Sequence, residues 1–237
     1  MRKIIKHIIS FFLVPVTQWY LSKERKYTYR GVTVTVLPGV FHPGFFYSTK
    51  FLLDYIGTQS VSGRTFLELG CGTGLLSVIA SKAGARVTAS DLNSRAIRNV
   101  VMNAELNGIA IQSIHSDLFD KIEKQTFDWI IINPPYYARR AETEEALAWY
   151  CGENFEYFQK LFTSLQHYID ETSQVIMVLT KGSEIDQIIA IAKKNHFDFE
   201  MIRENVVFFD EKDFLFRIRY VPSPEHLGTR DGTNVMA

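Results

Sequence analysis

A glycine-rich segment is the most chemically informative part of this 237-residue chain. Residues 66–74 read Phe-Leu-Glu-Leu-Gly-Cys-Gly-Thr-Gly, so a buried-strand pattern runs into glycines just before a helical pattern. With no side chains in the way, backbone N–H groups and a helix N-terminus can face a ligand there. The spacing of Gly70, Gly72 and Gly74 differs from the Gly-x-Gly-x-x-Gly of pyrophosphate-binding loops. Glu68, at the strand end, favours a cationic or amine-bearing ligand over a diphosphate.

A second segment, Asn133-Pro134-Pro135-Tyr136, combines oxygen acceptors with an aromatic ring. Consecutive prolines fix the backbone and remove two N–H donors, which leaves carbonyl groups as acceptors. The Asn133 side-chain oxygen and the Pro134 carbonyl can together hold both protons of a planar NH2 group, and Tyr136 offers a face for stacking. An amine held in this way directs its nitrogen lone pair toward an electrophile. A rigid turn is the simpler alternative, but a turn needs neither Asn133 nor Tyr136.

Two aspartates follow other predicted strands. Asp91 can accept two hydrogen bonds from a ribose diol, or it can cap the helix that is expected to follow it. Asp117 can accept from the exocyclic amine of an adenine, with Leu118 covering the ring. A lone aspartate in a loop is more often a turn residue, so only its place after a strand supports a binding role for Asp117.

Strand and helix patterns alternate from residue 65 onward, which brings these side chains to one edge of a sheet. Strands are expected at 65–69, 86–90, 109–114, 127–132 and 174–180, and helices at 75–82, 94–106, 155–169 and 185–195. Strand patterns at 199–209 and 214–221 lie so close together that they predict a hairpin. The fold class is therefore α/β, doubly wound and mostly parallel, with an antiparallel C-terminal hairpin. Ligands bind such sheets at the carboxyl ends of the strands.

Three segments are expected along the chain: an N-terminal helix and short β segment (1–60), a ligand-binding domain (61–222) and a flexible tail (223–237). The apolar run 4–16 is shorter than the roughly 20 residues of a bilayer span. It predicts an amphipathic helix packed on the domain, with weak interfacial membrane contact as the minority alternative. Alternation over 27–37 predicts a short strand or hairpin, and a helix is expected over 51–56.

Composition sets further limits on function. The formal net charge is zero, so nucleic acid could bind only through a local patch. The basic residues at 23–30 lie beside Tyr27 and Tyr29, a mixture that suits RNA or an ordinary solvated edge. Two cysteines and six scattered histidines form neither a disulfide framework nor a metal-ligand pattern. We therefore expect no metal, a reducing compartment and a cytoplasmic protein.

Segments 68–74 and 133–136 together resemble the class I S-adenosylmethionine-dependent N-methyltransferases, and among them the methyltransferase small domain group. That group includes release-factor glutamine, ribosomal RNA guanine N2 and some adenine N6 methyltransferases. The resemblance covers roughly residues 40–221 and includes the lead-in segment 40–53. The rRNA enzymes carry an acidic residue where this chain has Phe46 or Tyr47, which disfavours rRNA guanine. Residues 152–155, Gly-Glu-Asn-Phe, resemble the glutamine-modifying branch, which favours a protein substrate.

The resemblance implies a seven-stranded methyltransferase sheet with S-adenosyl-L-methionine across the strand ends. The implied cofactor-binding residues are Glu68, Gly70, Cys71, Gly72, Gly74, Asp91, Leu92, Asp117, Leu118 and Asn133. The implied catalytic residues are Asn133, Pro134, Pro135 and Tyr136. The implied acceptor is a release-factor-like protein glutamine or a nucleobase amine of RNA. The alternatives are a small-molecule amine, a nucleotide-binding oxidoreductase and a non-catalytic protein that retains a cofactor pocket.

Overall fold

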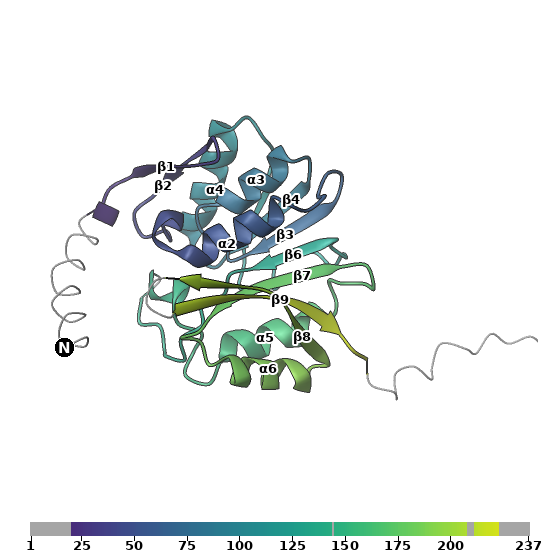
Figure 1. Cartoon of the computed structure of the whole chain (residues 1–237). Coiled ribbons are helices and arrows are strands. Elements are labelled where there is room, and N and C mark those ends of the chain that lie inside the picture. Colours follow the sequence, from purple (N-terminus) through teal and green to yellow (C-terminus); the bar gives the residue numbers. More distant parts are fainter. Residues whose placement is uncertain (1–19, 144, 208–210, 223–237) are drawn as a thin grey trace, which may run out of the picture.

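A seven-stranded sheet flanked by helices forms the centre of the computed structural model, which describes residues 20–143, 145–207 and 211–222 (Figure 1). Its strand order is β5-β4-β3-β6-β7-β9-β8. The parallel strands are β3 (Thr65–Leu69), β4 (Arg86–Asp91), β5 (Gln112–His115), β6 (Trp129–Ile132) and β7 (Gln174–Thr180). Strands β8 (Phe197–Val207) and β9 (Glu211–Tyr220) form the antiparallel pair at one edge. The predicted fold class is confirmed.

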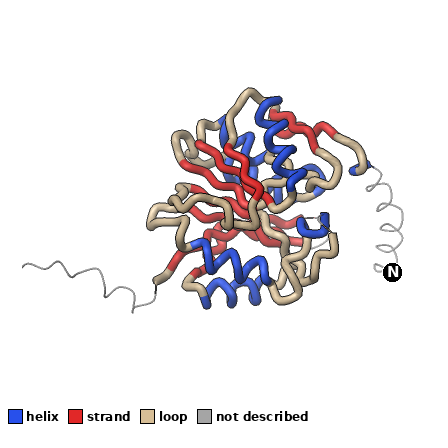
Figure 2. The backbone as a smooth tube through the Cα atoms, turned by 180° about the vertical axis from the view of Figure 1, so that it is seen from behind, coloured by secondary structure: helices blue, strands red, loops and turns tan. Residues whose placement is uncertain are grey.

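The helices cover both faces of the sheet, as the two blue groups around the red strands show in Figure 2. On one face lie α2 (Tyr47–Ile56), α3 (Leu75–Lys82) and α4 (Ser94–Leu106), and on the other lie α5 (Glu156–Leu165) and α6 (Ile185–Lys194) (Figure 1). Every side chain of β6 is buried, as expected for a parallel strand covered on both sides. Apolar clusters therefore fill both faces, one under α2 and α3 and the other under α5 and α6.

Several element ends differ from the expected ones. Strand β5 begins at Gln112 rather than at 109, because the Ile109 N–H closes the end of α4 on the Ala104 carbonyl. Helix α5 ends at Leu165, where turn hydrogen bonds take over. Helix α2 begins at Tyr47, four residues earlier than expected. The predicted helix over 4–16 and the tail over 223–237 lie outside the described residues. Within the described ranges, no helix combines the length and apolarity that crossing a bilayer requires.

The segment over 25–36 is a hairpin, one of the two forms expected for it. Strands β1 (Arg25–Tyr29) and β2 (Val32–Val36) pair antiparallel across a two-residue turn. Arg30 and Gly31 both have positive φ, 46° and 80°, which suits the twist of a tight hairpin. Val34 is fully buried and joins the apolar cluster under α2 and α3. The hairpin is thus packed on the domain through its apolar face.

Side-chain amides of α4 hold the outer edge of this hairpin. Asn103 is fully buried, and its Oδ1 accepts from the Thr35 N–H at 2.7 Å. Its Nδ2 donates to the carbonyls of Thr35 (2.8 Å) and Thr73 (2.9 Å). Thr73 belongs to the glycine-rich loop, so this one asparagine joins the hairpin to the predicted ligand-binding loop.

Asn99 and Asn107 lie four residues to either side of Asn103 and extend the contact along β2. Asn99 accepts from the Leu37 N–H at 3.0 Å and donates to the Thr35 carbonyl at 2.7 Å. Asn107 donates to the Thr33 carbonyl at 2.9 Å. Residues four apart share one face of a helix, so the three asparagines form a continuous row, here called the amide ladder.

Candidate active site

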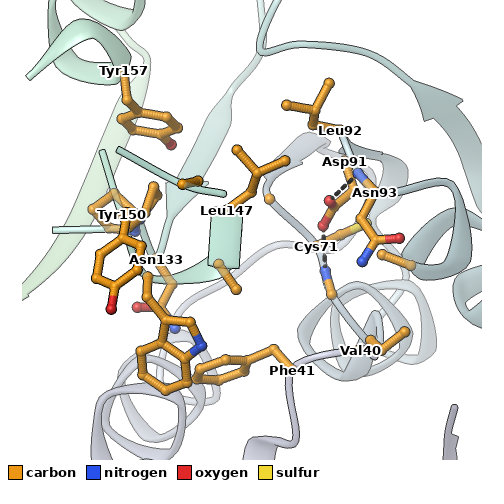
Figure 3. Close-up of a pocket in the computed structure, with 18 of the residues that line it drawn as sticks. Val40, Phe41, Cys71, Asp91, Leu92, Asn93, Asn133, Leu147, Tyr150 and Tyr157 are labelled. Atoms are coloured by element: carbon orange, nitrogen blue, oxygen red, sulfur yellow. Dashed lines mark hydrogen bonds between the residues drawn. The ribbon is translucent and has the colours of Figure 1, made fainter. Parts of the chain in front are cut away.

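A large cleft lies at the carboxyl ends of the central parallel strands (Figure 3). Its volume is about 1480 Å³. Pockets for one small ligand usually measure about 300 to 1,000 Å³, so this cleft has room for two reactants. The sequence-predicted residues that line it are Glu68, Gly70, Cys71, Gly72, Asp91, Leu92, Asp117, Leu118, Asn133, Pro134, Pro135 and Tyr136. Gly74 is the exception.

The three loop glycines serve different purposes. All have positive φ, 73° at Gly70, 52° at Gly72 and 72° at Gly74. A Cβ on Gly70 would meet nothing within 4 Å, and one on Gly72 would meet only Phe41 Cβ at 3.7 Å. These two positions leave bare backbone for a ligand. A Cβ on Gly74 would lie 2.7 Å from Val100 Cγ2, so Gly74 is needed for packing against α4.

Replacement of Gly74 by alanine is expected to lower the free energy of unfolding by about 1–3 kcal/mol, because it adds backbone strain and a clash with Val100. Urea unfolding would measure the loss. Gly70→Ala is the matched control, since it has nearly the same φ but open space around the new methyl. Gly70→Ala should lose less stability than Gly74→Ala. Equal stability losses in both variants would contradict the distinction.

Glu68 forms part of the cleft floor and is tied to the first turn of α3. Its Oε2 accepts from the Ser77 N–H at 2.9 Å and from the Ser77 hydroxyl at 2.5 Å. Burial raises the pKa of Glu68 to about 8, although both hydrogen bonds favour the carboxylate. A cation in the cleft would reverse this effect of burial, because it would stabilise the ionised form.

The raised pKa gives the ligand-free protein a definite pH dependence. Between pH 4.5 and about 8, the folded state keeps a Glu68 proton that the unfolded chain has released. This contribution to stability is complete below pH 4.5 and is lost as pH rises through 8. Wild-type protein should therefore lose more unfolding free energy than Glu68→Gln when urea denaturation is repeated at about pH 5 and about pH 8.5. Identical losses would show that Glu68 is not buried as described.

Asp91 is fixed by backbone N–H groups on both sides (Figure 3). Its Oδ2 accepts from Gly72 at 2.9 Å and its Oδ1 from Asn93 at 2.8 Å. Burial raises the pKa of this carboxyl group, and the two N–H donors oppose the rise. The residue that caps α4 is Asn93, whose side chain accepts from the Arg95 N–H, so the alternative capping role for Asp91 is wrong. Each Asp91 oxygen keeps a lone pair for a ligand.

Asp117 also lines the cleft, but it has a partner that the sequence did not suggest. Lys160 of α5 lies 2.6 Å from Asp117 Oδ2 and 2.6 Å from Asp120 Oδ2. The next residue, Leu118, is buried with φ at 50°, an uncommon conformation for leucine. Leu92 is 44% exposed beside Asp91 and offers apolar surface to the same part of the cleft.

The loop after β6 presents Asn133 to the cleft (Figure 3). Asn133 Nδ2 donates to the Thr49 hydroxyl at 3.4 Å. The Oδ1 atom is therefore left to accept a hydrogen bond from a ligand in the cleft. Thr49 lies in α2, so the lead-in segment orients this amide. Tyr136 lines the same cleft and packs against the apolar cluster under α5 and α6.

An aromatic wall, formed by Phe41, Phe46 and Trp149, closes the cleft beside this loop. The Phe41 and Phe46 rings stack with centroids 4.3 Å apart, and Trp149 contacts them at 5.4 and 4.8 Å. Trp149 is held in place because its carbonyl accepts from the Tyr137 N–H at 3.0 Å. Sequence reasoning missed this wall, since Trp149 lies far along the chain from Phe41 and Phe46 and no local pattern links them.

The basic residues at 23–30 are partly engaged within the protein. The Arg25 guanidinium stacks 4.1 Å from the Tyr20 ring centroid, and Arg30 pairs with Asp54 at 2.6 Å. The patch that could meet phosphate is therefore weaker than its composition indicates. In the residues that the structure covers, no group of three or more His, Cys, Asp or Glu side chains could hold a metal ion.

Comparison with known proteins places this fold and cleft in a class. A family model described as methyltransferase small domain matches residues 31–196. A Methanocaldococcus jannaschii protein, named provisionally as a protein N5-glutamine methyltransferase, is 35% identical over 107 residues, which are 45% of this chain and 52% of that protein. The ribosomal RNA small subunit methyltransferase C of Chromohalobacter salexigens is 33% identical over 114 residues, 47% of this chain and 34% of that one. The matches thus span about half or less of these relatives.

Solved structures share the fold. The T. thermophilus 16S rRNA N2 G1207 methyltransferase, in complex with AdoMet and guanosine, superposes with a TM-score of 0.59 at 20% identity, covering 83% of this chain and 50% of that one. The fold and the match over 31–196 define a class of S-adenosylmethionine-dependent methyltransferases. The chain belongs to the methyltransferase small domain family of that class.

The residues of the cleft fit the methyl donor of this family. Bare backbone at Gly70 and Gly72, with open space above Gly70, leaves room for an amino acid moiety. The Glu68 carboxyl group can face a cation, and Asp91 can face a diol. Leu92 and Leu118 supply apolar surface for a flat ring. A zwitterionic nucleoside satisfies all of these groups at once.

Proposed function

We propose that this chain transfers a methyl group from S-adenosylmethionine to the nitrogen of a planar amine or amide. The observation that carries the proposal is that Asn133 and Tyr136 face the same cleft as Glu68, Asp91 and the bare glycine backbone. The cleft volume accommodates a donor and an acceptor together. The acceptor is a protein glutamine side chain or a nucleobase amine of RNA, chemistries that the names of one relative and one structural neighbour carry.

The protein's part in the reaction is to position groups. Bound S-adenosylmethionine would supply an electrophilic methyl group next to Asn133. The Asn133 Oδ1 and the Pro134 carbonyl accept hydrogen bonds from the two N–H groups of the substrate nitrogen and stabilise the positive charge that develops on it. Tyr136 provides a face on which the planar group stacks. No strong general base is needed, because an alkylated nitrogen loses its proton readily to water.

The sequence segment 152–155 supports a protein acceptor, and the partly engaged basic residues at 23–30 weaken the case for RNA. Both acceptors nevertheless present the same planar nitrogen. A nucleobase acceptor would have to leave its stack to reach Asn133.

The decisive experiment supplies labelled S-adenosylmethionine and cell extract to the purified protein. Label that survives ribonuclease and is lost to protease identifies a protein acceptor, and the reverse identifies RNA. Label that survives both treatments lies on neither protein nor RNA, which leaves a small molecule or DNA. Asn133→Ala protein is the control for background transfer. Failure of the wild-type protein to bind S-adenosylhomocysteine in a thermal-shift assay would overturn the proposal.

A further inference from the structure

One face of α5 is turned toward the cleft, although the predicted site contains no residue of that helix. Phe158, Leu161, Phe162 and Leu165 are fully buried in the apolar cluster beneath the sheet. Tyr157 and Lys160, three positions apart and therefore on one face, line the cleft, and Tyr157 also packs against the border of that cluster. The hydrophobic pattern of the helix predicts the four buried positions, but it does not predict that Tyr157 and Lys160 reach the cleft.

The start of α5 is held rigidly. Glu156 accepts from the N–H and the side-chain amide of Asn154, at 3.0 and 3.1 Å. Gly152 has φ of 91°, and a Cβ there would lie 1.9 Å from Glu156 Oε2. The Tyr157 N–H donates to the Cys151 carbonyl at 3.1 Å. The hydrogen bonds of segment 152–156 thus fix the position of Tyr157 at the start of α5.

Tyr157 presents its hydroxyl to the cleft (Figure 3). Its ring packs edge-to-face on Phe158 at 5.2 Å. Burial raises the pKa of the Tyr157 hydroxyl, and the nearby carboxylates of Asp91 and Asp117 raise it further. Within the described part of the chain, no hydrogen bond joins this hydroxyl to another residue. A neutral phenol next to two carboxylates is suited to a nucleoside.

Lys160 forms an ion pair with Asp117. Its ammonium group bridges Asp117 Oδ2 and Asp120 Oδ2, each at 2.6 Å. Without this cation the two carboxylates would repel each other. With it, Asp117 Oδ2 is engaged and Oδ1 is left for a hydrogen-bond donor in the cleft.

We propose that α5 completes the nucleoside end of the cleft: Tyr157 contacts the purine nucleoside of the methyl donor, and Lys160 positions Asp117 against the exocyclic amine of the purine. This inference rests on the proposed function for the identity of the ligand. Tyr157 is a binding residue, whereas Lys160 acts through Asp117.

The test compares 5′-methylthioadenosine with 5′-methylthioinosine by titration calorimetry, since the second nucleoside lacks the amine. Tyr157→Ala should lower the affinity for both nucleosides about tenfold, and Tyr157→Phe should lower it by a smaller factor. Lys160→Met should lower the preference for methylthioadenosine about fivefold, and Lys160→Arg should restore it.

Matched controls lie outside the cleft. Tyr220 is a partly buried tyrosine of the same apolar cluster, and Lys212 pairs with Glu204 at 3.2 Å. Tyr220→Ala and Lys212→Met should leave both nucleoside affinities unchanged, and thermal unfolding verifies that each variant is folded. The inference would be overturned, without affecting the proposed function, by either of two results. One is that folded Tyr157→Ala binds both nucleosides as tightly as the wild-type protein does. The other is that Lys160→Met keeps the wild-type preference for methylthioadenosine over methylthioinosine. Absence of S-adenosylhomocysteine binding to wild-type protein would overturn the proposed function together with it.

Discussion

Replacement of Asn133 by alanine should slow methyl transfer about 10²- to 10³-fold while S-adenosylhomocysteine still binds with near wild-type affinity. The reason is that Oδ1 acts on the acceptor nitrogen, where positive charge appears only as the reaction proceeds. Single-turnover transfer of labelled methyl to the identified acceptor measures the rate, and calorimetry measures the affinity.

Two companion variants sharpen this test. Thr49→Val removes the hydroxyl that orients the Asn133 amide at 3.4 Å, so it should show a smaller loss of rate. Asn195→Ala removes a hydrogen-bonded asparagine at the end of α6, away from the cleft, and should transfer at the wild-type rate. Full activity in Asn133→Ala would refute the role given to this amide.

The second large effect is expected at Asn103, which does not itself line the cleft. Asn103→Ala would leave the Thr35 N–H and the Thr73 carbonyl without this buried partner. Each unsatisfied buried group costs about 1–3 kcal/mol, so the free energy of unfolding should fall by about 3 kcal/mol or more. Because Thr73 lies in the glycine-rich loop, affinity for S-adenosylhomocysteine should fall as well.

Urea unfolding and calorimetry measure these two losses. Asn107→Ala is the matched control, since Asn107 belongs to the same amide ladder but is only partly buried and does not contact the loop. It should cost about 1 kcal/mol and leave ligand affinity intact. A loss of similar size in both variants would show that burial and the contact with Thr73 are not decisive.

Much of the fold could be predicted because the sheet is parallel and doubly covered. Residues 129–132 form a continuous apolar run, and the positions of glycine and asparagine mark where helices stop. The start of β5 and the end of α5 could not be placed from the sequence. Both depend on turn hydrogen bonds that form where the chain leaves a helix. Local pattern carries no information on such closures.

Part of the site could likewise be predicted from the sequence, and part could not. Glu68, Asp91 and Asn133 follow strands, so topology alone brings them together. The aromatic wall and Lys160 depend on the path of the loop over 137–151 and on the rotation of α5, which tertiary packing decides. The asparagines at every fourth position from Asn99 to Asn107 are visible in the sequence, and they indicate a polar helix face that needs a hydrogen-bonding partner.

The amide ladder has a consequence beyond rigidity. Among the described residues, strand β2 pairs only with β1, and the backbone groups of Thr33, Thr35 and Leu37 on its other side bind the asparagines of the amide ladder. An open strand edge is a template on which another polypeptide can add, and this is a common route to aggregation. Here helix side chains take the place of a neighbouring strand, so the hairpin offers no such template along that edge.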